Sequence, residues 1–193
     1  MKDKLEKIPC LDLKGQNQQV KAEVFELFEK VFEKTAFSGG YFVEEFEKNF
    51  AHYSEANYAL GVSNGTTALH LAMLALGIGA GDEVIIPANT FIATAWGISH
   101  AGATPIFVDC TADSWEIDAS KIEEKITSKT KAIIGVHLYG QPFDIDAVKA
   151  ICDKHNLFLV EDAAQAQGAR YKGKTVGGFG EMACFSSYPG KNL

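Results

Sequence analysis

The chain has 193 residues, of which 47% are apolar and 22% charged, a composition that predicts a folded globular protein with one well-buried core. Its 18 basic and 25 acidic residues give a net charge of −7, and no segment combines clustered Lys or Arg with aromatic residues, which argues against a nucleic-acid partner. The start of the chain lacks the apolar core of a signal peptide, and no apolar stretch approaches the ~20 residues that span a membrane. We therefore expect a cytoplasmic protein, and we expect free, mostly buried thiols at Cys10, Cys110, Cys152 and Cys184, which show no CxxC spacing.

The first part of the chain is expected to be helical. Between Asn17 and Lys34, apolar residues recur at steps of three and four, which predicts an amphipathic helix whose phenylalanines lie in a core or an interface. Ser38, Gly39 and Gly40 end this helix, and a second helix follows with Val43, Phe46, Phe50 and Tyr53 on one face. Residues 1–55 therefore form an N-terminal helical arm that lies on the body of the domain or on a neighbouring subunit.

The segment from Tyr58 to Val62 is predicted to be the first strand, and the sequence SNGTTAL leads from it into a helix. Free N–H groups at the start of a helix can bind a phosphate. Gly65 would let the backbone approach, and the hydroxyls of Thr66 and Thr67 would add hydrogen bonds. The alternative is that this turn is only a helix cap, as at the start of most helices.

Strands and helices then alternate. Strands are predicted at Glu83–Ile86, Thr104–Val108 and Ala132–Val136, and helices up to about Ala101, around Ile117, Ile122 and Ile126, and at Asp144–His155. This order predicts an α/β fold with a mostly parallel sheet. Phe91 follows the Glu83–Ile86 strand, where its ring could stack on a flat ligand or simply pack against the protein.

The sequence NLFLVEDAAQ predicts a further strand and a site at its end. Leu157 to Val160 form an apolar run that is typical of a strand buried on both faces, and the run stops at Glu161 and Asp162. Ligands of open α/β sheets bind beyond the carboxyl ends of the strands, so Asp162 would point toward a cofactor and Gln165 could address the same place. Alternatively, Asp162 caps a helix or makes a structural contact.

Two glycine-rich segments resemble nucleotide-binding motifs. GIGAG at Gly77–Gly81 lies after a helix and does not fit GxGxxG. GARYKGKT at Gly168–Thr175 fits the P-loop pattern, but Gly173 is predicted to form a hairpin turn, and a P-loop must join a strand to a helix. Nucleotide binding that is lost on changing Lys174 remains an alternative. The five histidines lack the spacing of metal ligands, so no metal site is expected.

The last segment, MACFSSYPGKNL, predicts a strand from Met182 to Ser186 that leads to Lys191. A lysine after a strand, a Gly-Thr phosphate cradle, an aromatic ring and an acid at a strand end are together what pyridoxal phosphate (PLP) requires. The lysine would bond covalently to the cofactor, and Asp162 would keep the pyridine nitrogen protonated.

The segments SNGTTAL, PANTFIATA, VEDAAQAQGA and SSYPGKNL, in this order and at these separations, closely resemble the DegT/DnrJ/EryC1/StrS family of PLP-dependent sugar aminotransferases, from about Leu11 to the last residue. The resemblance implies the three-layer αβα large domain of a fold-type I PLP enzyme, here residues 56–193. It also implies roles for eight residues. Lys191 would be the lysine that carries the cofactor, Asp162 the partner of the pyridinium nitrogen and Gln165 a contact of the cofactor ring; the phosphate would be held by Gly65, Thr66, Thr67 and Ser186, with Phe91 stacked on the ring.

The resemblance also implies a reaction. Glutamate would give its nitrogen to the cofactor, which would then aminate a keto carbon of a nucleotide-linked deoxysugar, with C3 favoured over C4 by the forms LDLKGQNQQVK and YPGKNL. Family members continue well beyond this lysine and form homodimers with shared active sites, so we expect this chain to be a fragment without the small C-terminal domain. Whether it turns over alone is left open. A non-catalytic regulatory protein with the same fold is the alternative.

Overall fold

The computed structural model describes residues 12–191, which form two compact units. One unit reaches to Phe46, and the other runs from Glu47 onward, so the boundary falls within the second helix, α2 (Tyr41–Tyr53). The first unit contains α1 (Leu13–Glu33) and the start of α2. The assignment of residues 1–55 to an arm and 56–193 to a cofactor-binding domain stays a prediction.

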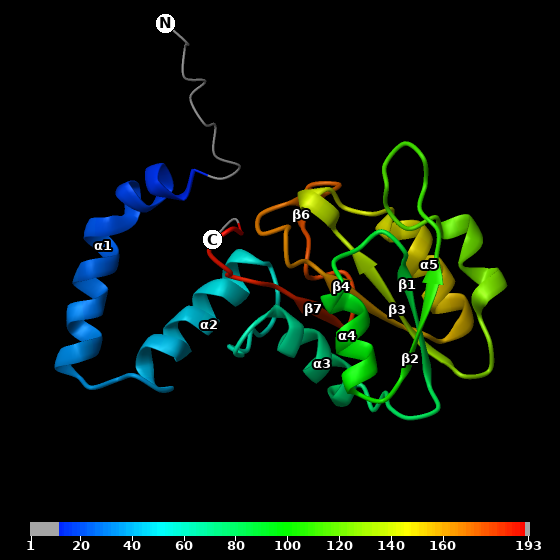
Figure 1. The fold of residues 1–193 in the computed structure, drawn as a ribbon, viewed down its shortest axis with the longest axis horizontal. Coiled ribbons are helices and arrows are strands. Elements are labelled where there is room, and N and C mark those ends of the chain that lie inside the picture. The colour runs from blue at the N-terminus through cyan, green and yellow to red at the C-terminus, as the bar shows by residue number, and fades with distance from the viewer. Residues whose placement is uncertain (1–11, 192–193) are drawn as a thin grey trace, which may run out of the picture. The chain divides into compact units, whose positions relative to one another are not determined.

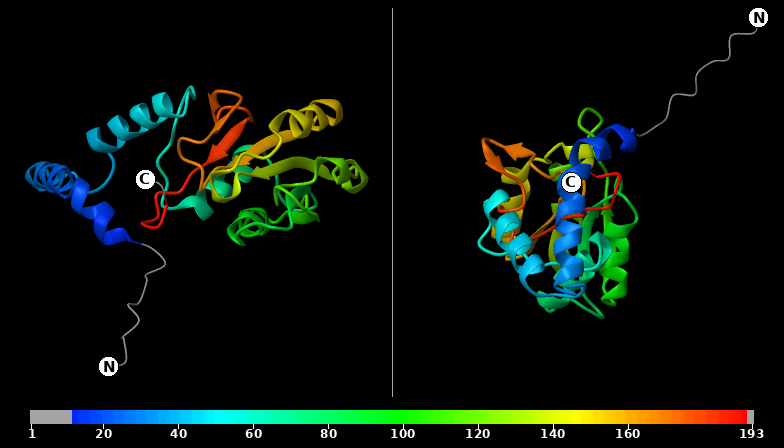
Figure 2. Two further views of the ribbon diagram at one scale, coloured as in Figure 1. Left: turned by 90° about the horizontal axis from the view of Figure 1, so that it is seen from above. Right: turned by 90° about the vertical axis from the view of Figure 1, so that its left-hand side faces the viewer.

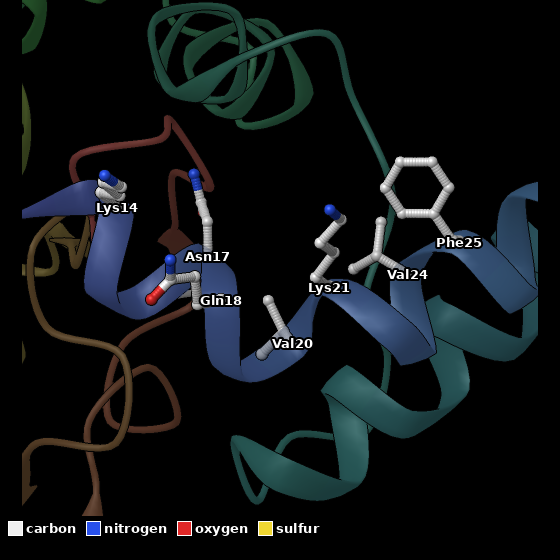
Figure 3. A pocket seen from close by; sticks show the side chains of 7 residues that line it. All are labelled: Lys14, Asn17, Gln18, Val20, Lys21, Val24 and Phe25. Atoms are coloured by element: carbon white, nitrogen blue, oxygen red, sulfur yellow. The ribbon is translucent and has the colours of Figure 1, made fainter.

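Helix α1 begins four residues before the predicted start. The side chain of Asp12 caps it by accepting a hydrogen bond from the N–H of Gly15 at 3.0 Å. None of its residues is buried in this chain; the side chains of Phe25, Phe28 and Phe32 are 66%, 59% and 62% exposed. Figure 3 shows part of its surface, a pocket lined by seven side chains of α1. The prediction that these phenylalanines lie in a core is therefore wrong within the described chain, and an interface stays a prediction.

The second unit is built on a parallel five-stranded sheet (Figure 1). Its strands lie in the order β2-β1-β3-β4-β7, and every neighbouring pair is parallel. The strands predicted from Glu83 onward are confirmed, with shifts of at most two residues at their ends; the strand predicted before them is discussed below. The strands are β1 (Glu83–Pro87), β2 (Thr104–Val108), β3 (Thr130–Val136), β4 (Phe158–Asp162) and β7 (Met182–Cys184).

Helices cover both faces of this sheet (Figure 2). Successive residues of a strand point to opposite faces. Ile86 of β1 accordingly packs in one buried cluster with Leu69 of α3 and Ile98 of α4, whereas Ile85 packs in another with Val148 of α5. The three-layer αβα architecture is therefore confirmed, with α3 (Gly65–Ala75) and α4 (Ala93–His100) in one layer and α5 (Ile145–His155) in the other.

The predicted strand from Tyr58 to Val62 is wrong. This segment has no regular secondary structure, and it pairs with no strand among residues 12–191. Tyr58 is 90% exposed and Leu60 78% exposed. A β-forming sequence becomes a strand only when a neighbour supplies ladder hydrogen bonds, and here the described chain supplies none.

The helix predicted around Ile117, Ile122 and Ile126 is also wrong. The structure has two short 3₁₀ turns in this place, Ala119–Lys121 and Glu123–Lys125. Asp118 begins the first turn, because its side chain accepts hydrogen bonds from both the N–H and the hydroxyl of Ser120. Such local bonds compete with the regular hydrogen bonds of an α-helix.

The P-loop interpretation of Gly168–Thr175 is wrong as well. The segment contains an antiparallel hairpin of β5 (Arg170–Tyr171) and β6 (Lys174–Thr175), turned at Gly173 with a φ of 87°. A positive φ suits glycine in a tight turn. The ammonium of Lys174 donates to the carbonyl oxygen of Gly178 at 2.6 Å. Because no helix follows the hairpin directly, the backbone cradle of a P-loop does not form.

Cys152 and Cys184 are buried free thiols, as expected, and Cys110 is a free, partly buried one; Cys10 lies outside the described residues. Burial raises the pKa of Cys152 to about 12, so this thiol is unreactive at neutral pH. None of the helices in residues 12–191 is long and apolar enough to cross a membrane.

Candidate active site

The polar residues singled out above lie at one edge of the sheet. Parallel strands end at the same edge, and β4 ends in Asp162 next to Cys184, the last residue of β7. The N–H of Ala163 donates to the carbonyl oxygen of Cys184 at 2.9 Å. The chain that leaves β7 therefore starts beside Asp162 and leads to Ser186 and Lys191.

Asp162 is a buried carboxylate, only 6% exposed. Its Oδ2 accepts a hydrogen bond from the hydroxyl of Thr94 at 2.7 Å, and its Oδ1 accepts one from the N–H of Ala164 at 3.2 Å. The hydroxyl of Thr94 in turn lies 2.7 Å from that of Thr90. Asp162 is thus held in one orientation by neutral donors.

The electrostatics of Asp162 favour a cationic neighbour. Burial raises the pKa of Asp162, and the hydrogen bond from Thr94 and the charges of His137 and Lys191 oppose that rise. A positively charged group placed against the carboxylate would favour its ionised form. Lys191 is half-buried, and its N–H donates to the carbonyl oxygen of Tyr188 at 2.7 Å, so it lies in a turn in the segment that follows β7.

Glu161 points away from Asp162, as alternation along a strand requires, and is completely buried. Its Oε2 lies 3.0 Å from Nε2 of His137, and its two carboxylate oxygens accept N–H bonds from Gly177, Phe179 and Gly180 at 2.8–2.9 Å. Burial alone would raise the pKa of Glu161, but these hydrogen bonds lower it below its usual value. Glu161 therefore ties the loop before β7 to the ends of β3 and β4.

The predicted phosphate cradle is partly assembled by close packing. Gly65 is buried against Ser186, and a Cβ at Gly65 would lie 3.1 Å from the Cβ of Ser186 and 3.4 Å from the carbonyl oxygen of Phe185. Asn64 caps α3 by accepting from the N–H of Thr67 at 2.8 Å, which confirms a helix cap at this turn. Within residues 12–191, no hydrogen bond occupies the N–H groups of Gly65 and Thr66, so both can serve an anion.

The remaining predicted residues lie around this edge. The Oε1 of Gln165 accepts a hydrogen bond from the N–H of Tyr139, just beyond β3, at 2.8 Å. Phe91 lies between β1 and α4 and is 63% exposed, so its ring is not packed into the core. Thr66 and Thr67 border a surface hollow together with Trp96.

Three residues around this edge were not predicted as part of a site. Thr94 orients Asp162, Glu161 holds the loop before β7, and Gln167 donates from Nε2 to the carbonyl oxygen of Ser186 at 2.6 Å. Glu161 could have been found from the sequence, because it is an acid next to Asp162 at the end of an apolar strand. Thr94 and Gln167 carry no such signal, because only the fold brings them to their partners.

The sheet, its two helical layers and the acid at the strand end define the large domain of a fold-type I aminotransferase, and solved structures of such enzymes match this chain. The chain belongs to the DegT/DnrJ/EryC1/StrS aminotransferase family, whose pattern matches residues 18–193.

Two curated relatives illustrate this membership. A "pleiotropic regulatory protein" of Geobacillus stearothermophilus is 47% identical over 186 residues, which cover 96% of this chain and 50% of the relative. The "dTDP-3-amino-3,4,6-trideoxy-alpha-D-glucose transaminase" of Streptomyces venezuelae is 45% identical over 187 residues, covering 97% and 49%. The chain thus spans about half the length of the curated relatives it matches.

Two solved structures are similar over nearly the whole chain. DesV of Streptomyces venezuelae, in complex with a ketimine intermediate, has a TM-score of 0.95 and 44% identity, covering 98% of this chain and 51% of its own. NtdA of Bacillus subtilis, with bound cofactor PMP, has a TM-score of 0.89 and 35% identity, covering 100% and 43%.

Proposed function

We propose that the protein is a PLP-dependent aminotransferase that transfers an amino group, from glutamate, to a keto carbon of a nucleotide-linked deoxysugar. The observation that carries this proposal is the buried Asp162, held by Thr94 at the edge of the sheet, with the charge of Lys191 acting on it. PLP chemistry needs an acid that binds the pyridinium nitrogen and an amine that bonds to the carbonyl carbon of the cofactor. Asp162 would be the acid, and Lys191 would be the amine.

The residues present fit the cofactor. The phosphate would be held by the N–H groups of Gly65 and Thr66 and the hydroxyls of Thr66, Thr67 and Ser186, at a turn where a glycine is packed against a serine with no room for a larger side chain. The protonated pyridine nitrogen of PLP would place a positive charge beside the buried Asp162 carboxylate and would favour its ionised form. When bound, PLP supplies an electron sink for the carbon that loses its proton.

Each proposed site residue has a task that its position supports. Asp162 supplies a fixed negative charge, and Thr94 keeps it in place. Lys191 Nζ would move a proton between the substrate carbon and C4′ of the cofactor, which requires an amine that is neutral for part of the cycle. The exposed ring of Phe91 would stack on the flat cofactor, and Gln165 would meet the ring from beyond β4.

The finer parts of the proposal have separate support. The name of the Streptomyces relative refers to a 3-amino sugar, which supports C3 as the aminated carbon. The exposed phenylalanines of α1 support a homodimer, because a row of large apolar side chains in water favours association. We propose that residues 1–55 form the arm of that dimer, that residues 56–193 form the cofactor-binding domain, and that the enzyme is cytoplasmic.

The test is a nitrogen-transfer assay on the purified protein with PLP, using ¹⁵N-glutamate and a panel of nucleotide-linked 3-keto and 4-keto deoxysugars. We expect ¹⁵N at C3 of the sugar product, and no transfer by a Lys191→Ala variant. Transfer only at C4 would correct the position. The absence of transfer, together with a Lys191 that never becomes covalently linked to the cofactor, would favour the regulatory alternative.

A further inference from the structure

We propose that Gln167 is a positioning residue for the cofactor phosphate and acts by holding Ser186. This inference rests on the proposed function, since it concerns the same cofactor site. It assigns a task to a residue that touches neither the ring nor the reacting atoms.

The contact between the two residues is direct and buried. The Nε2 of Gln167 donates to the carbonyl oxygen of Ser186 at 2.6 Å, and Gln167 is only 8% exposed. Its Oε1 is buried and has no hydrogen-bond partner among the described residues. The amide cannot be turned around, because its oxygen would then face the oxygen of Ser186. The NH₂ group of this buried amide therefore bonds to Ser186, whereas its unpaired oxygen lowers the stability of the fold.

Ser186 needs such a contact because it lies beyond the sheet. The last paired residues of β4 and β7 are Asp162 and Cys184, and β7 is an edge strand with one neighbour. Between Cys184 and Lys191, the last described residue, no strand pairing holds the chain. Gln167, five residues beyond Asp162, supplies by its side chain the next bond between the two segments.

The held conformation suits an anion. The Oγ of Ser186 is within 3.4 Å of the N–H of Tyr188, from which it accepts, so the hydroxyl proton is free to be donated elsewhere. The Cβ of Ser186 meanwhile lies against Gly65, at the first turn of α3. Gln167 thus fixes the peptide of Ser186 where its hydroxyl and the open N–H groups of the helix can serve one phosphate.

The test compares two ligands that differ only by the phosphate. The dissociation constants of PLP and of pyridoxal are measured by absorbance titration for the wild type, for Gln167→Met, which keeps the side-chain length but removes the donor, and for Gln141→Leu, an exposed control. We expect Gln167→Met to weaken PLP binding about tenfold, the size of one lost hydrogen bond to a charged site, and to change pyridoxal binding less than about twofold. Gln141→Leu should change neither.

A double-mutant cycle shows whether Gln167 acts through Ser186. In a Ser186→Ala background, Gln167→Met should cause little further loss of PLP affinity, because the hydroxyl that it positions is gone. If Gln167→Met does not fold, Gln167→Ala takes its place in the cycle. Equal losses of affinity for PLP and pyridoxal, or fully additive losses of PLP affinity in the cycle, would refute the positioning role of Gln167 and leave the proposed function standing. A wild-type protein that binds no PLP would instead overturn the proposed function, and this inference with it.

Discussion

The carboxylate of Glu161 lies 3.0 Å from Nε2 of His137, and both side chains are completely buried. The ring of His137 stacks on Phe143 with a centroid distance of 4.7 Å, and its backbone N–H donates to the carbonyl oxygen of Asp162. Together with the N–H bonds that Glu161 receives from Gly177 and Gly180, this pair joins three segments behind the proposed cofactor site.

Replacing Glu161 by Gln should therefore cost about 3 kcal/mol of folding free energy, because the amide would turn one NH₂ group toward buried donors. Urea unfolding measures the loss. Glu83→Gln is the matched control, since Glu83 accepts from the hydroxyl of Thr127 at the amino end of β1, where the bond is exposed. We expect the control to lose less than about 1 kcal/mol. Equal losses for the two variants would show that the Glu161 network is not special.

Glu116 makes stability depend on pH. It is 5% exposed, and burial raises its pKa from 4.5 to about 8, against a hydrogen bond from the backbone of Leu138. An acid with a raised pKa in the folded state stabilises the fold below pH 4.5, and this contribution is lost as the pH rises toward 8. Between pH 5 and pH 8, Glu116→Gln should gain about 3 kcal/mol relative to the wild type. Urea unfolding at both pH values tests this, with the exposed Glu124→Gln as a control; parallel pH profiles of wild type and Glu116→Gln would contradict it.

Thr94 should stabilise the buried carboxylate of Asp162. Thr94→Val keeps the shape but removes the hydroxyl that donates to Oδ2, so the pKa of Asp162 should rise further and the fold should lose about 1–2 kcal/mol near pH 7. Thr104→Val, at an exposed position in β2, is the matched control and should be close to neutral. If thermal unfolding gives the same midpoint for Thr94→Val as for the control, the hydrogen bond to Asp162 contributes nothing measurable.

Gly65 should be required for the phosphate cradle. A methyl group there would lie 3.1 Å from the Cβ of Ser186, so Gly65→Ala must push apart the two segments that would hold the anion. We expect PLP affinity to fall at least about tenfold, by the loss of a charged hydrogen bond or more. Gly79→Ala is the control, because its methyl group would meet only the carbonyl oxygen of Ala101 at 3.4 Å. Unchanged PLP affinity in Gly65→Ala would place the phosphate elsewhere.

The sequence predicted most of the sheet because its strands are continuous apolar runs. Residues such as Ile85, Ile133 and Leu159 are fully buried, and burial of this kind leaves a clear pattern. The segment Tyr58–Val62 also contains β-forming residues, yet it has no neighbouring strand among residues 12–191. A pattern of residues shows that a strand is possible, but pairing is a property of the fold.

The candidate site was predicted in part for the same reason. Asp162 and Lys191 stand out by their type and their position at or after the ends of strands, and the charge of Lys191 opposes the rise in the pKa of Asp162 that burial causes. The contact of Gln167 with Ser186, nineteen residues apart, depends on where β4 and β7 end in space. Polar contacts between such segments follow no short-range rule.

The most direct test of the account is borohydride trapping of the purified protein after addition of PLP, with peptide mapping, on the wild type and on Lys191→Ala. We predict a visible absorbance band with PLP and, after reduction, a cofactor fixed on the peptide that contains Lys191; the variant should show neither. A folded protein whose Lys191 remains unmodified, or a variant that traps cofactor as well as the wild type, would contradict the proposal that Lys191 carries the cofactor.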